Sequence, residues 1–131
     1  MITKGSGFTL IELLVVVAII GILSATGILA YNGYIKGTKQ KSAENAMQQI
    51  SLAQTEYYSN NGEYHNDGDA CTPTGTTSNL IETKLFSGGD VITKEAGYEM
   101  CIELDGAIFL VKASNGTKTI TLTANGVWTG K

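Results

Sequence analysis

The first half of the chain contains a long stretch without charge. No residue between Leu13 and Ile35 is charged, and most of them are apolar. About 20 apolar residues, each rising about 1.5 Å, are enough to cross a bilayer as a helix. The pattern therefore predicts a membrane-spanning helix.

The same helix is predicted to continue after the apolar stretch. Apolar residues recur at spacings of three and four, which is typical of one face of an amphipathic helix; they are Ala43, Ala46, Met47, Ile50, Ala53 and Tyr57. Asn60-Asn61-Gly62 is a strong helix stop, because Asn and Gly accept the left-handed conformation. We predict one helix from about Thr9 to Ser59. Its glycines between Gly21 and Gly33 leave open whether it bends locally or stays straight.

The segment 62–97 is rich in turn-forming residues and is predicted to be an irregular connecting loop. Its one short apolar piece is Leu80–Phe86. Asp67 and Asp69 flank Gly68, which faintly suggests calcium, but two carboxylates are too few for a calcium loop. We expect a solvated turn there and no metal site.

From Tyr98 onwards the pattern changes to strict alternation. Asp105-Gly106, Asn115-Gly116 and Asn125-Gly126 follow at about ten-residue spacing, and such pairs predict β-hairpin turns. The result is an antiparallel meander of three or four strands. One face, expected to pack on the helix, carries Met100, Ile102, Leu104, Ile120 and Leu122, while Cys101 points away beside Glu99 and Glu103. The predicted fold class is α+β, a long N-terminal helix packed on a small antiparallel sheet.

Composition limits the possible functions. The 131 residues carry a net charge of −3, and all nine basic residues are lysines. This is not a nucleic-acid-binding composition, because such domains are basic. The one histidine, His65, lies among turn-formers with no nucleophile–base spacing near it, so we expect a surface histidine, no enzyme and no cofactor.

The strongest motif precedes the apolar stretch. Gly7 is followed by Phe8-Thr9-Leu10-Ile11-Glu12 and then by the uncharged run. This resembles the prepilin signal of the type IV pilin superfamily. An ordinary signal peptide is the alternative, but its small-residue cleavage site follows the apolar region, whereas here the small residues precede it.

The resemblance implies a processing site. A prepilin peptidase would cut between Gly7 and Phe8 and methylate the new N-terminus at Phe8. The chain would then divide into a leader at residues 1–7, a transmembrane and assembly helix at 8–30, and a pilin globular domain at 31–131 that includes the second half of the helix.

Glu12 is an ionisable residue at the start of the apolar stretch. A buried charge is tolerable only when it is paired. Cleavage would create an α-amine on Phe8, which Glu12 could meet in its own chain or in a neighbouring subunit, and that pairing would set the register between subunits. The resemblance implies the same assembly role. The alternative is a carboxylate that merely reaches the lipid headgroups.

Cys71 and Cys101 follow the apolar stretch and so lie in the domain that the prepilin motif places outside the cytoplasm. An even pair of cysteines in an exported domain indicates a disulfide. It would fasten the connecting loop across the outer face or edge of the sheet. Zinc is not expected with one histidine and no CxxC motif. In the family the pair commonly brackets a C-terminal loop, so its placement here departs from that pattern.

The function expected from this resemblance is a structural subunit of a type IV pilus, which serves adhesion, twitching motility or DNA uptake. Tyr57-Tyr58, followed by Asn61-Gly62-Glu63-Tyr64, also resembles type IVa pilins. The alternatives are a pseudopilin of a type II secretion system, or a minor pilin that acts as an adhesin or DNA-binding module. The implied partners are other pilin subunits, the prepilin peptidase, the inner-membrane pilus assembly machinery and lipid. The implied location is the bacterial inner membrane and then the extracellular pilus.

Overall fold

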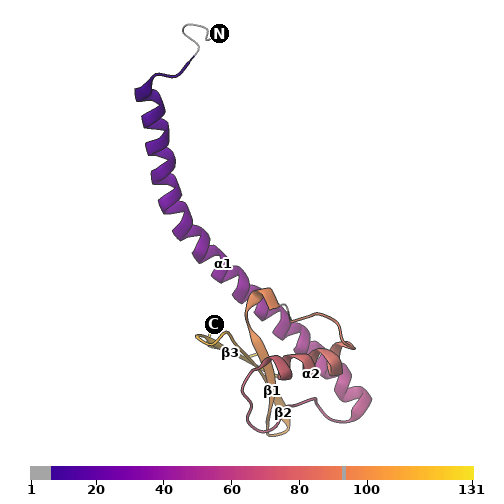
Figure 1. Ribbon diagram of the computed structural model, residues 1–131. Coiled ribbons are helices and arrows are strands. Elements are labelled where there is room, and N and C mark those ends of the chain that lie inside the picture. The colour runs from indigo at the N-terminus through magenta and orange to yellow at the C-terminus, as the bar shows by residue number, and fades with distance from the viewer. Residues whose placement is uncertain (1–6, 93) are drawn as a thin grey trace. The chain divides into compact units, whose positions relative to one another are not determined.

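The computed structural model describes residues 7–92 and 94–131. Its order along the chain is two helices, a short 3₁₀ helix and four strands: α1 (Leu10–Asn61), α2 (Gly75–Phe86), η1 (Lys94–Ala96), β1 (Glu99–Asp105), β2 (Ile108–Ser114), β3 (Thr119–Thr123) and β4 (Trp128–Thr129). The long helix and the small sheet, both visible in Figure 1, confirm the predicted α+β fold.

The chain forms two compact units, which we describe separately. The N-terminal unit ends at Gly37, and the C-terminal unit comprises Thr38–Lys131. Helix α1 contributes to both units. The domain boundary expected near residue 30 stays a prediction.

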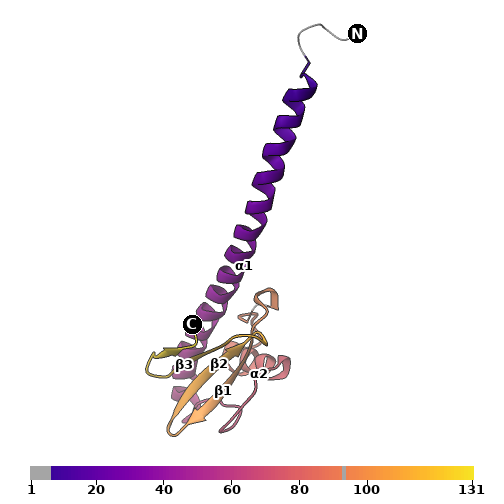
Figure 2. The same ribbon diagram turned by 90° about the vertical axis from the view of Figure 1, so that its left-hand side faces the viewer.

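The sheet is a simple antiparallel meander in the order β1-β2-β3-β4, as Figure 2 shows for its larger strands. All three predicted glycine turns lie between consecutive strands. Gly116, for example, has a φ of 91°, a conformation that side chains with a Cβ rarely adopt. The fourth strand, left open by the sequence, is present as the short β4.

The core of the C-terminal unit lies between the second half of α1 and one face of the sheet. Two cross-strand rows build that face, Met100–Ala113–Ile120 and Ile102–Val111–Leu122. Helix α1 contributes Ala43, Ala46, Met47 and Ile50 to the same buried cluster. The predicted helix face and sheet face are therefore confirmed, although Leu104, Ala53 and Tyr57 are only half-buried.

The prediction of an irregular segment over residues 62–97 was wrong, because α2 lies within it. The first five residues of α2, Gly75–Asn79, are all weak helix formers. The helix begins because the Thr74 side chain accepts a hydrogen bond from the Thr77 backbone N–H, while the Thr77 side chain accepts one from the Thr74 N–H. Ile81 is fully buried. Capping and burial together outweigh the poor local propensity.

Candidate assembly site and the polar network of the C-terminal unit

The start of α1 is closed by a reciprocal pair of hydrogen bonds. The Thr9 backbone N–H donates to Glu12 Oε2 at 3.1 Å, and the Glu12 N–H donates to Thr9 Oγ1 at 3.2 Å. The first N–H groups of a helix have no partner within the helix, and this arrangement, a capping box, satisfies two such donors at the helix start. The signature of this cap, Thr-x-x-Glu before an apolar run, is present in the sequence.

Gly7 and Phe8 lie immediately before this cap. The Phe8 side chain is 80% exposed. Residues 1–6 of the expected leader, with Lys4, lie outside the described residues. The structure places Glu12 against the backbone one residue after Phe8, so the capping hydrogen bonds and the expected pairing with the Phe8 amine involve the same carboxylate.

The apolar side chains of α1 are exposed throughout its first half. Every large hydrophobic residue from Phe8 to Leu29 is at least 45% exposed. Among the described residues, α1 is the one helix long and apolar enough to cross a membrane, although a signal sequence meets the same criterion. A helix that is apolar all round is typical of burial in a membrane or among other helices.

Two hydroxyl groups within this apolar stretch are satisfied by the helix itself. Ser24 Oγ donates to the Ile20 carbonyl at 2.7 Å, and Thr26 Oγ1 donates to the Leu23 carbonyl at 3.1 Å. Because an unsatisfied polar group costs free energy in an apolar medium, these bonds make the polar side chains compatible with lipid or with a helix bundle.

The predicted disulfide is present. Cys71 and Cys101 are joined across 30 residues of sequence, and Cys101 in β1 is fully buried. The Cys71 N–H also donates to Glu103 Oε1 at 3.1 Å, and Lys112 Nζ bonds both that carboxylate and the Cys71 carbonyl. The hydrogen bond from Lys112 holds the pKa of Glu103 below its usual value, against the opposing effect of burial. Covalent and charged contacts thus fasten the connecting segment to the outer face of the sheet.

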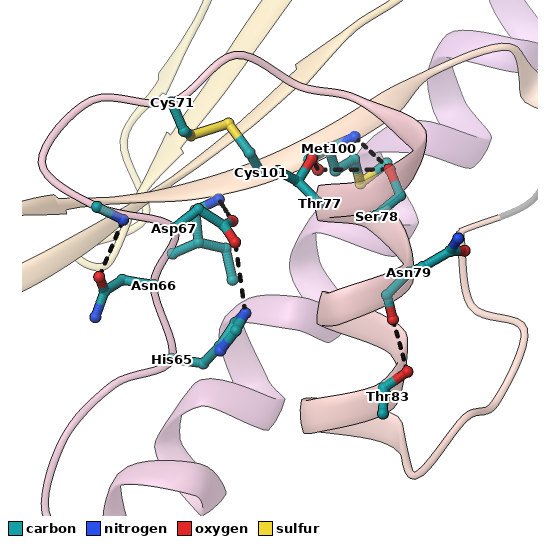
Figure 3. A network of polar contacts seen from close by, with 12 residues as sticks. His65, Asn66, Asp67, Cys71, Thr77, Ser78, Asn79, Thr83, Met100 and Cys101 are labelled. Carbon is teal, nitrogen blue, oxygen red and sulfur yellow. Dashed lines mark hydrogen bonds and ion pairs between the residues drawn. A yellow bond between two sulfur atoms is a disulfide. The ribbon is translucent and has the colours of Figure 1, made fainter.

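His65 is not the surface residue that the sequence suggested. Its side chain is 10% exposed and packs edge-on against Tyr57, and its Nε2 lies 3.9 Å from Asp67 Oδ1, as Figure 3 shows. Burial lowers the pKa of His65, although the charge of Asp67 opposes this shift. The histidine is therefore held in its neutral form near pH 7.

Gln54 fixes the backbone of His65. Its fully buried side chain accepts a hydrogen bond from the His65 N–H at 2.9 Å and donates to the His65 carbonyl at 2.7 Å. Gln54 falls four residues after Ile50 on the buried face of α1, a position that could have drawn attention to it. The described residues hold no group of three or more His, Cys, Asp or Glu side chains suited to a metal ion.

Comparison with known proteins agrees with the N-terminal motif. The family model for the prokaryotic N-terminal methylation motif matches residues 3–28. The chain is 38% identical over 91 residues to fimbrial protein EcpC of Eikenella corrodens, covering 66% of this chain and 60% of that protein. It is 32% identical over 127 residues to a type IV major pilin protein PilE1 of Neisseria gonorrhoeae, covering 97% of this chain and 58% of that protein.

The chain also matches a third relative over a short stretch of high identity. Over 33 residues, 25% of this chain, it is 70% identical to the type IV major fimbrial protein FimA of Dichelobacter nodosus, of which it covers 21%. The matches span between about two fifths and three fifths of the length of the first curated relatives. No solved structure gave a significant match.

The chain thus carries the prokaryotic N-terminal methylation motif at the start of a long helix, which is apolar in its first half and is followed by further helical turns and a small antiparallel sheet. The methylation motif and the similarity to the named fimbrial and pilin proteins support a relationship to the type IV pilin superfamily.

Proposed function

We propose that this protein is a structural subunit of a type IV pilus and polymerises through its N-terminal helix. The observation that carries the proposal is the exposed apolar surface that α1 presents over its first half. Exposed apolar area of this size is unfavourable in water. Lipid would cover it before assembly, and the helices of other copies would cover it in the filament.

The proposal includes processing at the N-terminus. The prepilin peptidase would cut between Gly7 and Phe8 and methylate Phe8, which divides the chain into residues 1–7, 8–30 and 31–131 as expected above. The match to the methylation motif supports this step. The cleaved subunit would be held in the inner membrane until the pilus assembly machinery adds it to the extracellular filament.

Glu12 would have two successive roles. In the single subunit its carboxylate caps α1 together with Thr9. In the filament the same carboxylate would pair with the Phe8 amine of a neighbouring subunit. The cap needs only a hydrogen-bond acceptor, whereas the pair needs a negative charge, so the two roles can be separated by substitution.

The test compares Glu12→Ala with Glu12→Gln. Glutamine keeps the acceptor that a capping box requires but has no charge. Because removing one partner of a buried ion pair costs about 3–5 kcal/mol, we expect both variants to lose filaments while cleaved protein stays in the membrane. Electron microscopy of sheared surface fractions measures filaments. Immunoblots of membranes, with intact mass to identify a chain beginning at methylated Phe8, measure the cleaved subunit.

Thr9→Val is the matched control, because it removes the Thr9 side-chain acceptor and leaves the Glu12 charge in place. We expect it to retain filaments. Normal filaments from Glu12→Gln would mean that Glu12 acts only as a cap. A wild-type chain that never forms filaments would contradict the proposed function itself.

The pseudopilin and the adhesin or DNA-binding minor pilin remain alternative hypotheses. The relatives are a fimbrial protein and a type IV major pilin, which favours the pilus subunit.

A further inference from the structure

β1 lies at one edge of the sheet, so one of its two sides has no neighbouring strand in the sheet. β1 is the first strand of the sheet, so β2 is its one neighbour among the named strands, and Thr74 adds an isolated antiparallel bridge to Met100. Met100, Ile102 and Leu104 direct their main-chain groups away from β2, because their partners lie outside the sheet. An unprotected row of such groups is a template for pairing with another chain.

The segment 66–78, which we call the edge strap, occupies this row. The Asp67 N–H donates to the Ile102 carbonyl at 2.7 Å, and Asp67 Oδ2 accepts from the Ile102 N–H at 2.8 Å. The Leu104 N–H donates to the Gly68 carbonyl at 3.0 Å. One aspartate thus supplies both a main-chain donor and a side-chain acceptor to one residue of β1.

The other end of the strap, in the first turn of α2, forms hydrogen bonds with the Met100 backbone. Ser78 Oγ accepts from the Met100 N–H at 2.9 Å, and Thr77 Oγ1 donates to the Met100 carbonyl at 2.7 Å. Figure 3 shows these Met100 contacts on one side of the Cys71–Cys101 bond and Asp67 on the other. Most of the contacts use side chains, so the strap is not itself a continuous strand.

The disulfide lies between the two groups of contacts. Cys71 is inside the strap, and Cys101 is the β1 residue between Met100 and Ile102. We propose that the edge strap is a redox-controlled cover: with the disulfide closed it seals the outer edge of β1, and with the disulfide reduced it releases that edge. This inference does not depend on polymerisation.

The chemistry of release is a thiol–disulfide exchange. A dithiol reductant breaks the Cys71–Cys101 bond, supplies two electrons and two protons to form two thiols, and is itself oxidised to a disulfide. Breaking this tether leaves hydrogen bonds to hold the strap, including those of Asp67 with Ile102 and those of the Cys71 backbone with Glu103 and Lys112. Local opening of such a segment has its own free energy, separate from global unfolding.

Amide hydrogen exchange tests the proposal with an internal control in the same strand. The full chain is held in detergent micelles with either dithiothreitol or its oxidised form, and exchange is followed at single residues. We expect reduction to accelerate exchange of the Ile102 and Leu104 amides at least tenfold. The amides of Cys101 and Glu103 alternate with these, face β2 in the antiparallel ladder, and should change much less.

Two results would overturn the proposal. Unchanged exchange at Ile102 and Leu104 after verified reduction would show that the disulfide does not control the strap. Equal acceleration of all four amides would show that the bond supports the whole sheet and not its edge. As a second arm, Asp67→Ala in the oxidised chain should accelerate Ile102 while leaving Glu103 near its original rate, and no difference between these two amides would also contradict the assignment.

Discussion

The two halves of α1 belong to one helix and yet depend on different surroundings. In the N-terminal unit Ile20 is 56% exposed, whereas Ile50 in the C-terminal unit is fully buried. The described partners of the first half are local, namely the Thr9–Glu12 cap and the hydroxyl groups bonded one turn back. The second half of α1 contributes side chains to the hydrophobic core of the C-terminal unit. One continuous helix therefore combines an exposed apolar half with a half that builds part of the core of the C-terminal unit.

The glycines of the first half fit this contrast. A side chain at Gly21 or Gly27 would meet no atom within 4 Å beyond the adjacent residues and backbone of its own helix. The packing of the chain itself therefore gives no reason for a small residue at these positions. Under the proposed function, the reason would be close approach of neighbouring helices.

The largest expected effect comes from making the same substitution in each half. Ile50→Ala should lower the free energy of unfolding of the C-terminal unit by about 2–5 kcal/mol, because it leaves a cavity in a packed core. Ile20→Ala should change it by less than about 0.5 kcal/mol. Denaturant unfolding of the full chain in micelles, followed by Trp128 fluorescence, measures both. Equal destabilisation by the two variants would contradict the division into two units.

A smaller effect is expected from the two hydrogen bonds between the Gln54 side chain and the His65 backbone, which we call the polar clamp. Gln54→Ala removes both partners of the His65 backbone and should cost about 1–3 kcal/mol, the usual penalty for a stranded buried polar group. Gln49→Ala is the matched control, since Gln49 is exposed on the same helix, and it should stay within about 0.5 kcal/mol. The same unfolding assay applies, and a neutral Gln54→Ala would rule out the clamp as a source of stability.

The smallest effect should appear on mild acidification. Burial lowers the pKa of His65 in the folded chain, so the unfolded chain takes up the proton first as pH falls. The unfolding midpoint should therefore fall as pH drops through about 6.5, the ordinary histidine value, and level off below the folded pKa. His65→Gln should remove this phase.

In more acidic solution the unfolded chain also takes up a proton at Glu103 first, because the hydrogen bond from Lys112 lowers the pKa of Glu103 in the folded chain, and this should cause a second loss of stability. It should begin below the ordinary value of 4.5 and continue as pH falls through the folded pKa. His65→Gln should leave this second phase in place. A pH profile that His65→Gln leaves unchanged above pH 5.5 would contradict the assignment of the first phase to His65.

Local patterns were enough to predict the long helix, the glycine turns and the apolar faces of the sheet. Each depends on residues close in sequence, such as the spacing from Ala43 to Ile50 or the Asn115-Gly116 pair. The prepilin motif and the cysteine pair were likewise visible as short patterns. The Thr9–Glu12 cap also corresponds to a short pattern in the sequence, Thr-x-x-Glu before an apolar run.

Tertiary structure alone decided α2, the burial of His65 and the edge strap. The residues at the start of α2 favour turns, and they become helical because Thr74 and Thr77 cap the chain while Ile81 enters the core. Asp67 looked like a solvated turn residue, but its carboxylate accepts a hydrogen bond from Ile102, 35 residues away. The sequence by itself determined the features that depend on residues close together along the chain. Contacts between residues far apart along the chain were decided only by the tertiary structure. Their hydrogen bonds and burial exist only once the sheet and helices have come together.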